Sequence, residues 1–226
     1  MRSAIVRAGT WPVVVFAILL VAGCGGQEPP SQGGKQPSPQ GGEGPQELWT
    51  FDEDATGGPP QGSEVFGGTW EVRQESDAPT APNALCQTGE AEFPALVLGD
   101  AVYTDVVLST SFKTISGEED QAAGLIFRVK DEGNYYIVRA NALEDNVAIY
   151  KYRDGRRSEI VSESVEVPPG EWQELRVEAV GDRIRGFLGD EQVVETTDDE
   201  FPAGGVGLWT KADSVTCFDR VLVEAA

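Results

Sequence analysis

The 226-residue chain contains no histidine. That absence excludes a serine–histidine triad, a histidine-ligated zinc site and histidine acid–base catalysis, because each of them needs an imidazole. Basic side chains are also scarce, since 17 Lys and Arg residues stand against 38 Asp and Glu residues, for a formal net charge of −21. A field of that sign repels phosphate backbones, so we expect no nucleic-acid partner. Any catalysis must use carboxylates, Tyr, Lys, Arg or a bound metal.

The first 23 residues have the order of a cleavable export signal. Arg2 and Arg7 give a positive start, residues 13–21 form an unbroken apolar run, and two small residues precede Cys24. The run is too short to cross a hydrocarbon core of about 30 Å comfortably as a helix. Residues 20–24 resemble the lipobox of bacterial lipoproteins, which implies cleavage before Cys24 and acylation of that cysteine. The alternative is an ordinary secreted protein in which the cysteine stands by chance.

Two or three acyl chains on Cys24 would anchor the protein firmly, because each buried methylene contributes about 0.8 kcal/mol and one chain alone does not suffice. Residue 25 is Gly rather than Asp, and the general sorting rule for such lipoproteins then implies the outer membrane or the cell surface. We therefore expect an exported protein that contacts the membrane only through its anchor. Its acidic folded part should stand off anionic headgroups.

Residues 25–47 consist almost entirely of Gly, Pro and Gln, with Ser and a few charges. Such a segment has no apolar side chains to bury, so the sequence predicts that residues 24–47 are a lipidated, disordered tether. From residue 48 onward Trp, Phe, Val and Ile become frequent. Residues 48–226 are enough for one domain with a proper core.

Residues 48–226 contain no long segment with helical periodicity, but short alternating runs followed by turn residues recur along them. The pairs Asp154-Gly155 and Gly189-Asp190 stand between such runs and predict hairpins. Many short strands at this spacing predict an all-β fold, an antiparallel two-sheet sandwich or jelly roll. The predicted strands are residues 48–52, 67–74, 84–89, 94–97, 105–113, 122–130, 134–141, 146–152, 158–161, 172–179, 183–188, 191–196, 205–210 and 215–224.

Strand alternation assigns the side chains of two neighbouring strands to opposite faces. In residues 122–130 the odd positions through Val129 are expected in the core, and the even positions, including Arg128, on the other face. In residues 134–141 the even positions are expected in the core, which leaves Arg139 and Asn141 on the other face. Such a mixture of apolar, guanidinium and amide groups is typical of a half-open binding face, and equally of an ordinary solvated sheet face.

Acylation of Cys24 would leave Cys86 and Cys217 in an oxidising compartment. A pair of cysteines there is more often a disulfide than a site, with two free buried thiols as the alternative. Closing so long a loop would stabilise the fold by about 4–5 kcal/mol in the chain-entropy model.

Four stretches carry a specific family resemblance: residues 120–128 (DQAAGLIFR), 134–146 (NYYIVRANALEDN), 170–178 (GEWQELRVE) and 205–215 (GVGLWTKADSV). They resemble a bacterial family of concanavalin A-like domains called 3-keto-disaccharide hydrolases, formerly a domain of unknown function. That family is close to laminin-G-like domains and to family 16 glycoside hydrolases. The resemblance covers roughly residues 48–224, and it implies a jelly-roll sandwich with a concave face and carbohydrate as the ligand class.

The retaining chemistry of family 16 does not carry over. Those enzymes use a Glu-x-Asp-x-Glu type of strand, and retention needs two carboxyl groups about 5–5.5 Å apart. The nearest candidate here is residues 118–120, and no carboxylate occupies residues 122–124. We therefore reject a retaining glucanase of this kind.

The first candidate site combines planar hydrogen-bonding groups, which read adjacent sugar hydroxyls, with an aromatic platform. The alternative is a surface ladder of ion pairs that joins the two arginines to Asp120 and Glu144. The candidate ligand-binding residues are Arg128, Arg139, Asn141, Trp209 and Lys211, together with Asp120.

A second candidate site pairs Asp52, near the start of the domain, with Asp219, near its end. In the family 16 relatives a structural calcium lies between N-terminal residues and an Asp on the last strand, so the resemblance implies calcium here. Carboxylate oxygens are suitable ligands for that ion. The alternative is that Asp219 caps a turn or pairs with Arg220. We expect no other cofactor.

These observations leave three functions open. The first is a lipid-anchored module of the cell envelope that binds carbohydrate without cleaving it. The second is a hydrolase or lyase that cleaves 3-keto-glycosides, with Asp120 as the base and Arg128, Arg139 or Lys211 stabilising the enolate. The third is a structural or protein-binding envelope module, because related folds bind proteins as readily as glycans.

Overall fold

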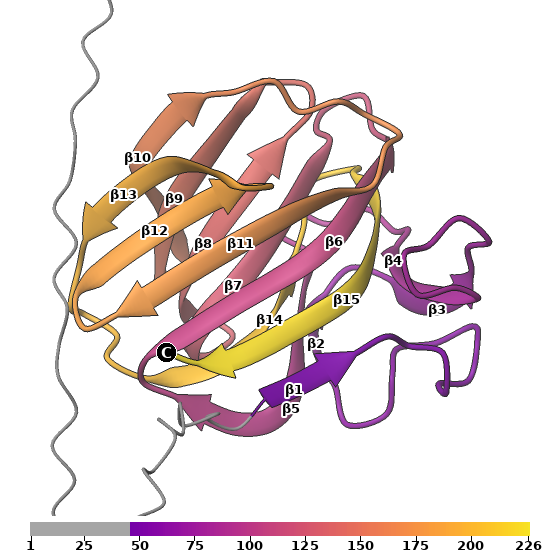
Figure 1. Ribbon diagram of the computed structural model, residues 1–226, viewed down its shortest axis with the longest axis horizontal. Helices are drawn as coiled ribbons and strands as arrows, with labels where there is room; N and C mark the ends of the chain where they lie inside the picture. The colour runs from indigo at the N-terminus through magenta and orange to yellow at the C-terminus, as the bar shows by residue number, and fades with distance from the viewer. Residues whose placement is uncertain (1–45) are drawn as a thin grey trace, which may run out of the picture. The chain divides into compact units, whose positions relative to one another are not determined.

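A computed structural model describes residues 46–226. The expected signal peptide, Cys24 and residues 25–45 of the tether lie outside the described residues. The described part contains fifteen strands and no helix (Figure 1), which confirms the prediction of an all-β fold. None of its segments is a helix long and apolar enough to cross a membrane.

Eight strands form the first sheet, and all of their pairings are antiparallel. Strand β1 pairs with β15 beside the main path of the sheet. The strands, in spatial order, are β13 (Glu191–Thr197), β12 (Arg183–Leu188), β11 (Gln173–Val180), β6 (Val106–Ser116), β15 (Val215–Ala225), β4 (Asn83–Gln87) and β3 (Trp70–Gln74), with β1 (Gln46–Trp49).

Seven strands form the second sheet, which lies behind the first in Figure 1 and is also antiparallel throughout. In spatial order they are β10 (Arg156–Ser164), β9 (Asn146–Arg153), β8 (Asn134–Asn141), β7 (Ala122–Asp131), β14 (Gly204–Trp209), β5 (Ala95–Tyr103) and β2 (Glu64–Gly67).

The hydrophobic core fills the space between the two sheets. Leu108 and Phe112 of β6 enter it from the eight-stranded sheet, and Leu125 of β7 and Leu208 of β14 enter it from the seven-stranded sheet. Alternation along each strand sends every second side chain inward, which is the arrangement of a sandwich. The predicted two-sheet jelly-roll sandwich is thus confirmed.

The two predicted hairpins are both present. Asp154 and Gly155 join β9 to β10 with φ angles of 50° and 74°, the left-handed values that a two-residue turn between twisted strands requires. Gly189 and Asp190 join β12 to β13. Because the turn fixes the pairing, Arg157 stands opposite Tyr152.

The predicted disulfide between Cys86 and Cys217 is also present. The two residues are direct partners on neighbouring strands β4 and β15, with their Cα atoms 4.0 Å apart, and both are fully buried. The bridge closes a loop over a sequence separation of 131 residues.

The face assignment fails at the end of β7. The register with β8 shifts between Phe127 and Asp131, and Arg128 has a φ of 51°. Such a bulge reverses the alternation beyond it. Val129, expected in the core, therefore packs on the outer face of the sheet with Ile126, and Arg128 does not share a face with Arg139.

Several predicted boundaries are also wrong: the predicted strand 94–97 continues to Tyr103 in β5, and 158–161 lengthens to Arg156–Ser164 in β10. The run 67–74 is not one strand, because Gly68, with a φ of 82°, separates the end of β2 at Gly67 from β3 in the other sheet. The first strand starts at Gln46, two residues inside the expected tether.

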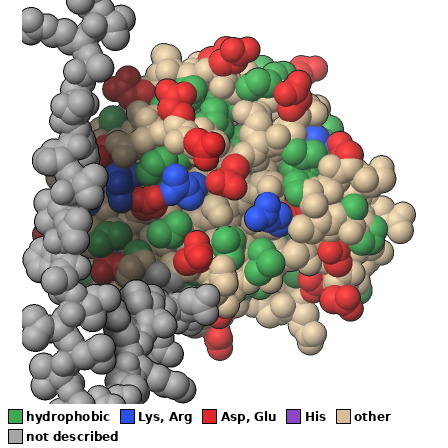
Figure 2. All heavy atoms as spheres, viewed as in Figure 1, with side chains coloured by type: hydrophobic (Ala, Val, Ile, Leu, Met, Phe, Trp, Pro, Cys, Tyr) green, Lys and Arg blue, Asp and Glu red, His purple; other side chains and the backbone are tan. Residues whose placement is uncertain are grey.

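The outer face of the eight-stranded sheet carries acidic and basic side chains interspersed with single hydrophobic ones (Figure 2). Glu178 pairs with both Arg176 and Arg185, and Arg183 pairs with Glu195 at 2.7 Å. Such a ladder of exposed or half-exposed ion pairs is typical of a solvated sheet face.

Candidate functional site

The outer face of the seven-stranded sheet, which points away from the other sheet, carries a layer of aromatic rings. Phe93 stacks on Trp209 with centroids 5.9 Å apart, and Tyr135 stacks on Tyr152 at 4.8 Å. Offset stacking at these distances stabilises ring pairs beyond simple burial. We call this layer the aromatic cluster; its members are Phe66, Phe93, Tyr135, Tyr150, Tyr152 and Trp209.

Trp209 is fully buried within this cluster. Its indole N–H lies near the hydroxyl of Tyr135 but has no partner at hydrogen-bond geometry. Burial raises the pKa of Tyr135, so its phenol is neutral and can accept or donate a hydrogen bond across the whole physiological range.

Arg157 lies over three rings of the aromatic cluster. Its guanidinium carbon is 4.6 Å from the ring centroid of Tyr150, 5.0 Å from that of Phe93 and 5.6 Å from that of Trp209. A cation over aromatic faces is attracted by their electron density. Within residues 46–226 no carboxylate approaches the Arg157 guanidinium closely enough for an ion pair.

Arg157 was not among the predicted site residues, because the predicted strand 158–161 began one residue after it. The turn at residues 154–155 carried the necessary signal. A two-residue hairpin loop sets the pairing of the strands that flank it, so Arg157 had to stand opposite Tyr152 and share its face.

A group of polar side chains borders the aromatic cluster, and we call it the polar ledge: Asp120, Arg139, Asn141, Glu144 and Lys211. Asn141 donates to one oxygen of Asp120 at 2.6 Å, and Lys211 pairs with the other. Arg139 donates to Glu144 at 2.8 Å while its guanidinium carbon lies 5.2 Å from the Tyr150 ring centroid. The ledge and the cluster are therefore continuous.

Charge pairing within the polar ledge changes the pKa of Glu144. Burial works to raise the pKa of Glu144, but the positive charge and hydrogen bonds of Arg139 outweigh it and hold the pKa below its usual value. Lys211 acts in the same direction. Glu144 is therefore ionised at neutral pH.

Asp213 fixes the polar ledge in place. Its carboxylate accepts hydrogen bonds from the backbone N–H groups of Glu118, Glu119 and Asp120, at 2.6–3.1 Å for the shortest of each. These backbone donors lower the pKa of Asp213. The arrangement ties the segment before β7 to the segment after β14 and so sets Asp120 beside Lys211.

The structure thus brings together five members of the first predicted set: Asp120, Arg139, Asn141, Trp209 and Lys211. Asp120 is only 1% exposed and both of its oxygens are engaged, so its direct contacts position Lys211 and Asn141. The ion pair of Arg139 with Glu144 is the one that the ladder alternative expected.

Arg128 is set apart from these residues. Its buried guanidinium donates to the carbonyl oxygens of Gly181 at 2.7 Å, Thr104 at 3.2 Å and Phe201 at 3.4 Å. These carbonyls belong to three different loops, so Arg128 holds connections of both sheets together. The bulge in β7 is the physical reason that the grouping with Arg139 is wrong.

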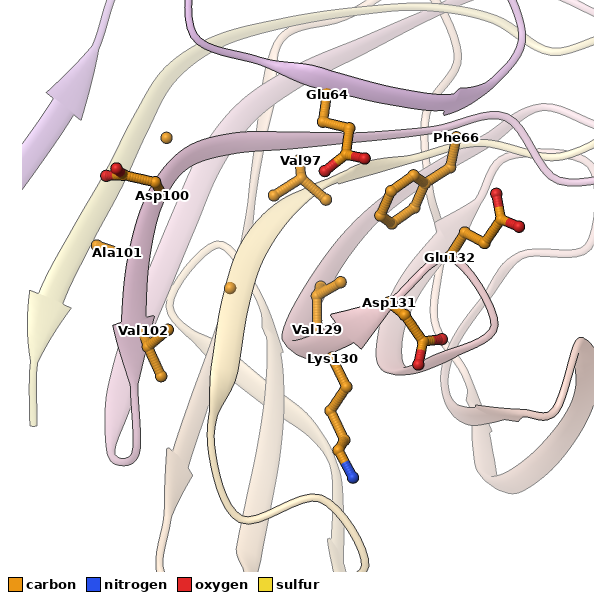
Figure 3. Close-up of a pocket in the computed structure, with 12 residues that line it drawn as sticks. Glu64, Phe66, Val97, Asp100, Ala101, Val102, Val129, Lys130, Asp131 and Glu132 are labelled. Carbon is orange, nitrogen blue, oxygen red and sulfur yellow. The ribbon is translucent and has the colours of Figure 1, made fainter.

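Hollows open on the same outer face. One of about 380 Å³ is lined by the rings of Phe66, Phe93, Tyr135 and Tyr152, with Glu132 at its edge. A second, of about 490 Å³, shares Phe66 and Glu132 with the first. Figure 3 shows Phe66 reaching over this second hollow toward Val97 and Val129, with Glu64 at its edge and the amine of Lys130 pointing away.

A third hollow, of about 520 Å³, lies beside the polar ledge and is lined by Lys211 with the exposed carboxylates of Glu90, Glu92 and Glu119. Rings that offer flat faces next to a few polar groups are the usual lining of a site for a small polar ligand.

Asp52 and Asp219 each have a protein donor. Asp219 is fully buried and accepts from the backbone N–H and the hydroxyl of Thr80, both at 2.6 Å, while Asp52 accepts from the backbone N–H of Asn83 at 3.1 Å. These donors occupy lone pairs that a calcium ion would need. Calcium stays a prediction, and the contacts present suit anchors for the segment before β4.

Among residues 46–226 the side chains that converge as metal ligands would are those of Glu75, Cys86 and Cys217. The two sulfurs are bonded to each other, so this group does not fit a metal site.

Two comparisons with known proteins concern carbohydrate enzymes and modules. Levanase of Bacillus subtilis (strain 168) is 27% identical over 140 residues, which are 61% of this chain but only 20% of levanase. The chain therefore spans about a fifth of the length of that relative. The solved structure of a carbohydrate-binding module, CBM66 of Bacillus subtilis, is 25% identical with a TM-score of 0.63, covering 73% of this chain and 96% of the module.

A putative glycosyl hydrolase from Parabacteroides distasonis ATCC 8503 is 15% identical with a TM-score of 0.53, over 80% of this chain and all of that one, and shares the fold alone. Residues 51–223 match the model of the 3-keto-alpha-glucoside-1,2-lyase-like domain. The chain belongs to this family of 3-keto-alpha-glucoside-1,2-lyase-like domains.

Proposed function

We propose that the protein binds carbohydrate on the outer face of its seven-stranded sheet. The observation that carries this proposal is the Arg157 guanidinium, which lies over three aromatic rings without a carboxylate partner in the described part of the chain. Similarity to a carbohydrate-binding module over nearly its whole length supports the same function. Stacked rings receive the apolar face of a sugar, and free guanidinium donors read its oxygens.

The ligand would enter the hollow between Phe66, Phe93, Tyr135 and Tyr152. Phe93 and Tyr152 are only partly buried, so their outward surfaces are free to stack. Burial works with the charges of Glu92 and Glu132 to raise the pKa of Tyr152, which keeps its hydroxyl a hydrogen-bond donor at neutral pH.

Calorimetry of the purified protein against a saccharide panel that includes levan fragments tests this proposal. Phe93→Ala should weaken binding about two- to tenfold, since stacking on one ring contributes roughly 0.5–1.5 kcal/mol. Phe187→Ala is the matched control, because Phe187 stacks under Arg176 on the other sheet. Equal losses from the two variants, or no binding across the panel, would contradict the proposal and favour a structural or protein-binding module.

A second candidate function, cleavage of 3-keto-glycosides, is favoured by the family to which residues 51–223 belong. A base would take the C2 proton, the electron pair would move onto the C3 oxygen as an enolate, and collapse of the enolate would expel the C1 substituent. Lys211 lines a hollow and is the candidate cation to stabilise that oxygen, whereas Arg139 is only 1% exposed and is bonded to Glu144. The exposed Glu92 and Glu119, which share a hollow with Lys211, complement Asp120 as candidates for the base.

Proton NMR of the protein with a 3-keto-glucoside separates this function from binding alone. New olefinic or anomeric signals indicate cleavage. Unchanged cleavage by Asp120→Asn would remove Asp120 as the base, and unchanged cleavage by Lys211→Met would remove Lys211 as the stabilising cation.

We also propose that the domain is exported and held on the cell envelope by acylated Cys24. The export signal and lipobox in residues 1–24 support this location. On an outer surface, a carbohydrate-binding module would retain glycans close to the cell.

A further inference from the structure

Arg157 is exceptional among the basic residues that the structure describes. Most Lys and Arg side chains pair with a carboxylate, as expected in a chain with a formal charge of −21. Those without an ion pair are Lys130, Arg156 and Arg220, which are exposed, and Arg157, which is half-buried. In so acidic a protein, a partly buried guanidinium without a carboxylate is left open to an outside partner.

Unused hydrogen-bond donors surround the same place. Nη1 of Arg157 and Nε of Arg139 are both buried without a hydrogen-bond partner, and Arg139 is only 1% exposed. Both guanidiniums lie against the ring of Tyr150. A buried donor without an acceptor costs free energy, about 1–3 kcal/mol and more for a charged group. A ligand that brings acceptors would recover it at Arg157, which is half-buried, but not at Arg139, which lies beneath the surface.

The nearby carboxylates do not pair with Arg157. Asp120 is occupied by Lys211 and Asn141, and Glu144 by Arg139. Glu92 and Glu159 are exposed at the rim, where their charges act on Tyr152 and Tyr150, and neither forms an ion pair with Arg157. The centre of the face is thus a positively charged spot within an acidic surface.

We infer that the outer face selects carbohydrates that carry a carboxylate group, of the uronic-acid class, and that Arg157 is the residue that pairs with this carboxylate. This inference rests on the proposed carbohydrate-binding function. A planar guanidinium bonds both oxygens of a carboxylate at once, with charge-assisted hydrogen bonds stronger than those to neutral hydroxyls. The negative field of the whole chain works against anions, so only a ligand that reaches Arg157 is accepted.

Matched pairs of methyl glycosides test the inference by calorimetry: glucuronoside against glucoside, and galacturonoside against galactoside. At least one uronoside should bind about tenfold more tightly than its neutral partner, and raised salt should narrow that gap. Arg157→Gln should abolish the preference, while Arg157→Lys should retain part of it because the charge remains without the paired donors. Arg156→Gln makes the same change of charge on the adjacent exposed residue and should leave the preference intact.

Equal affinity for both members of each pair, or a preference that Arg157→Gln leaves unchanged, would overturn the inference while the carbohydrate-binding function stands. Failure of every neutral and acidic sugar to bind would overturn both. Circular dichroism of each variant establishes that the protein is folded, so that a loss of the preference for uronosides is not caused by unfolding.

Discussion

Trp209 packs directly on Gly124, its register partner on the neighbouring strand. A Cβ atom at position 124 would lie 3.0 Å from Cε3 of the indole and 3.3 Å from the Trp209 Cβ. The missing side chain is therefore what lets a tryptophan lie across β7 and reach the ring of Phe93.

Gly124→Ala should push the indole out of this position. We expect a loss of stability of about 1–3 kcal/mol from overpacking, a shift in tryptophan fluorescence and weaker sugar binding. Gly58→Ala is the control, because a Cβ there meets nothing within 4 Å. Unaltered fluorescence and affinity in Gly124→Ala would show that the aromatic cluster does not depend on this contact.

Arg128→Gln should destabilise the fold strongly and leave sugar affinity unchanged while the protein remains folded. The substitution deprives three loop carbonyls of their donor and leaves them unsatisfied near the core. Each such loss costs about 1–3 kcal/mol, so urea unfolding should show a decrease of about 3 kcal/mol or more. Lys130→Gln, at an exposed neighbouring position, should show almost no decrease in the free energy of unfolding. A selective loss of sugar binding by folded Arg128→Gln would instead assign Arg128 to the ligand site.

Replacing Cys86 and Cys217 together with alanine should lower the free energy of unfolding by about 2–5 kcal/mol, because the bridge constrains a long loop in the unfolded chain. Denaturant unfolding of the variant, compared with the parent protein under oxidising conditions, measures the difference. Addition of a reductant should destabilise the parent protein and leave the variant unaffected. A reductant effect of equal size in both would assign the change to something other than this bridge.

The loop that joins β13 to β14 should make stability sensitive to acid. Burial works to raise the pKa of Asp198, but hydrogen bonds from Lys151 and Tyr136 outweigh it and hold the pKa below its usual value. A carboxylate with a lowered folded pKa stabilises the protein above its unfolded pKa, near 4, and this contribution disappears as pH falls through the folded value.

Asp198→Asn should therefore be less stable than the parent protein at pH 6, and the difference should shrink at about pH 2–3. Urea midpoints at the two pH values measure this, with Asp199→Asn, an exposed neighbour, as the control. A difference that stays constant with pH would mean that the Asp198 charge contributes nothing.

Cys24→Ser should release the protein from membranes, because the lipobox reading makes this cysteine the sole acylated residue. Cell fractionation and the mass of the mature N-terminus measure the outcome. A variant that still pelleted with membranes would contradict a Cys24 anchor.

Most of the strand pattern could be predicted from local features. Residues 134–141 and 183–188 are strands with the expected bounds. In both, the alternating hydrophobic pattern and the turn residues that end it are local features of the sequence. The disulfide was predicted from the number of cysteines and the expected oxidising compartment. Tyr135 and Tyr136 were expected to face opposite ways, and they do, with Tyr136 in the core and Tyr135 outside.

The candidate site could be predicted only in part. Asp120, Arg139, Asn141 and Lys211 were grouped by family resemblance and strand parity, and they meet across strand pairs. Arg128 was assigned to the wrong face because its left-handed backbone conformation creates a bulge, which reverses the alternation of side chains along β7. Nothing in the local composition indicates that bulge. Phe93 and Phe66 were missed because they come from connections and an edge strand whose positions depend on tertiary packing.

The length of the turn at Asp154 and Gly155 determines which side chain of β10 lies on the outer face. One additional residue in that turn would slide β10 by one position and exchange Arg157 for Arg156 on the outer face, since a slip of one residue inverts a strand. The same slip would turn Ile160, which packs against the core, toward the outer face, so loop length would change both the ligand-facing side chain and the packing of this edge strand. Descendants of a common ancestor could diverge in sugar preference through insertions at this hairpin while the core sequence stays constant.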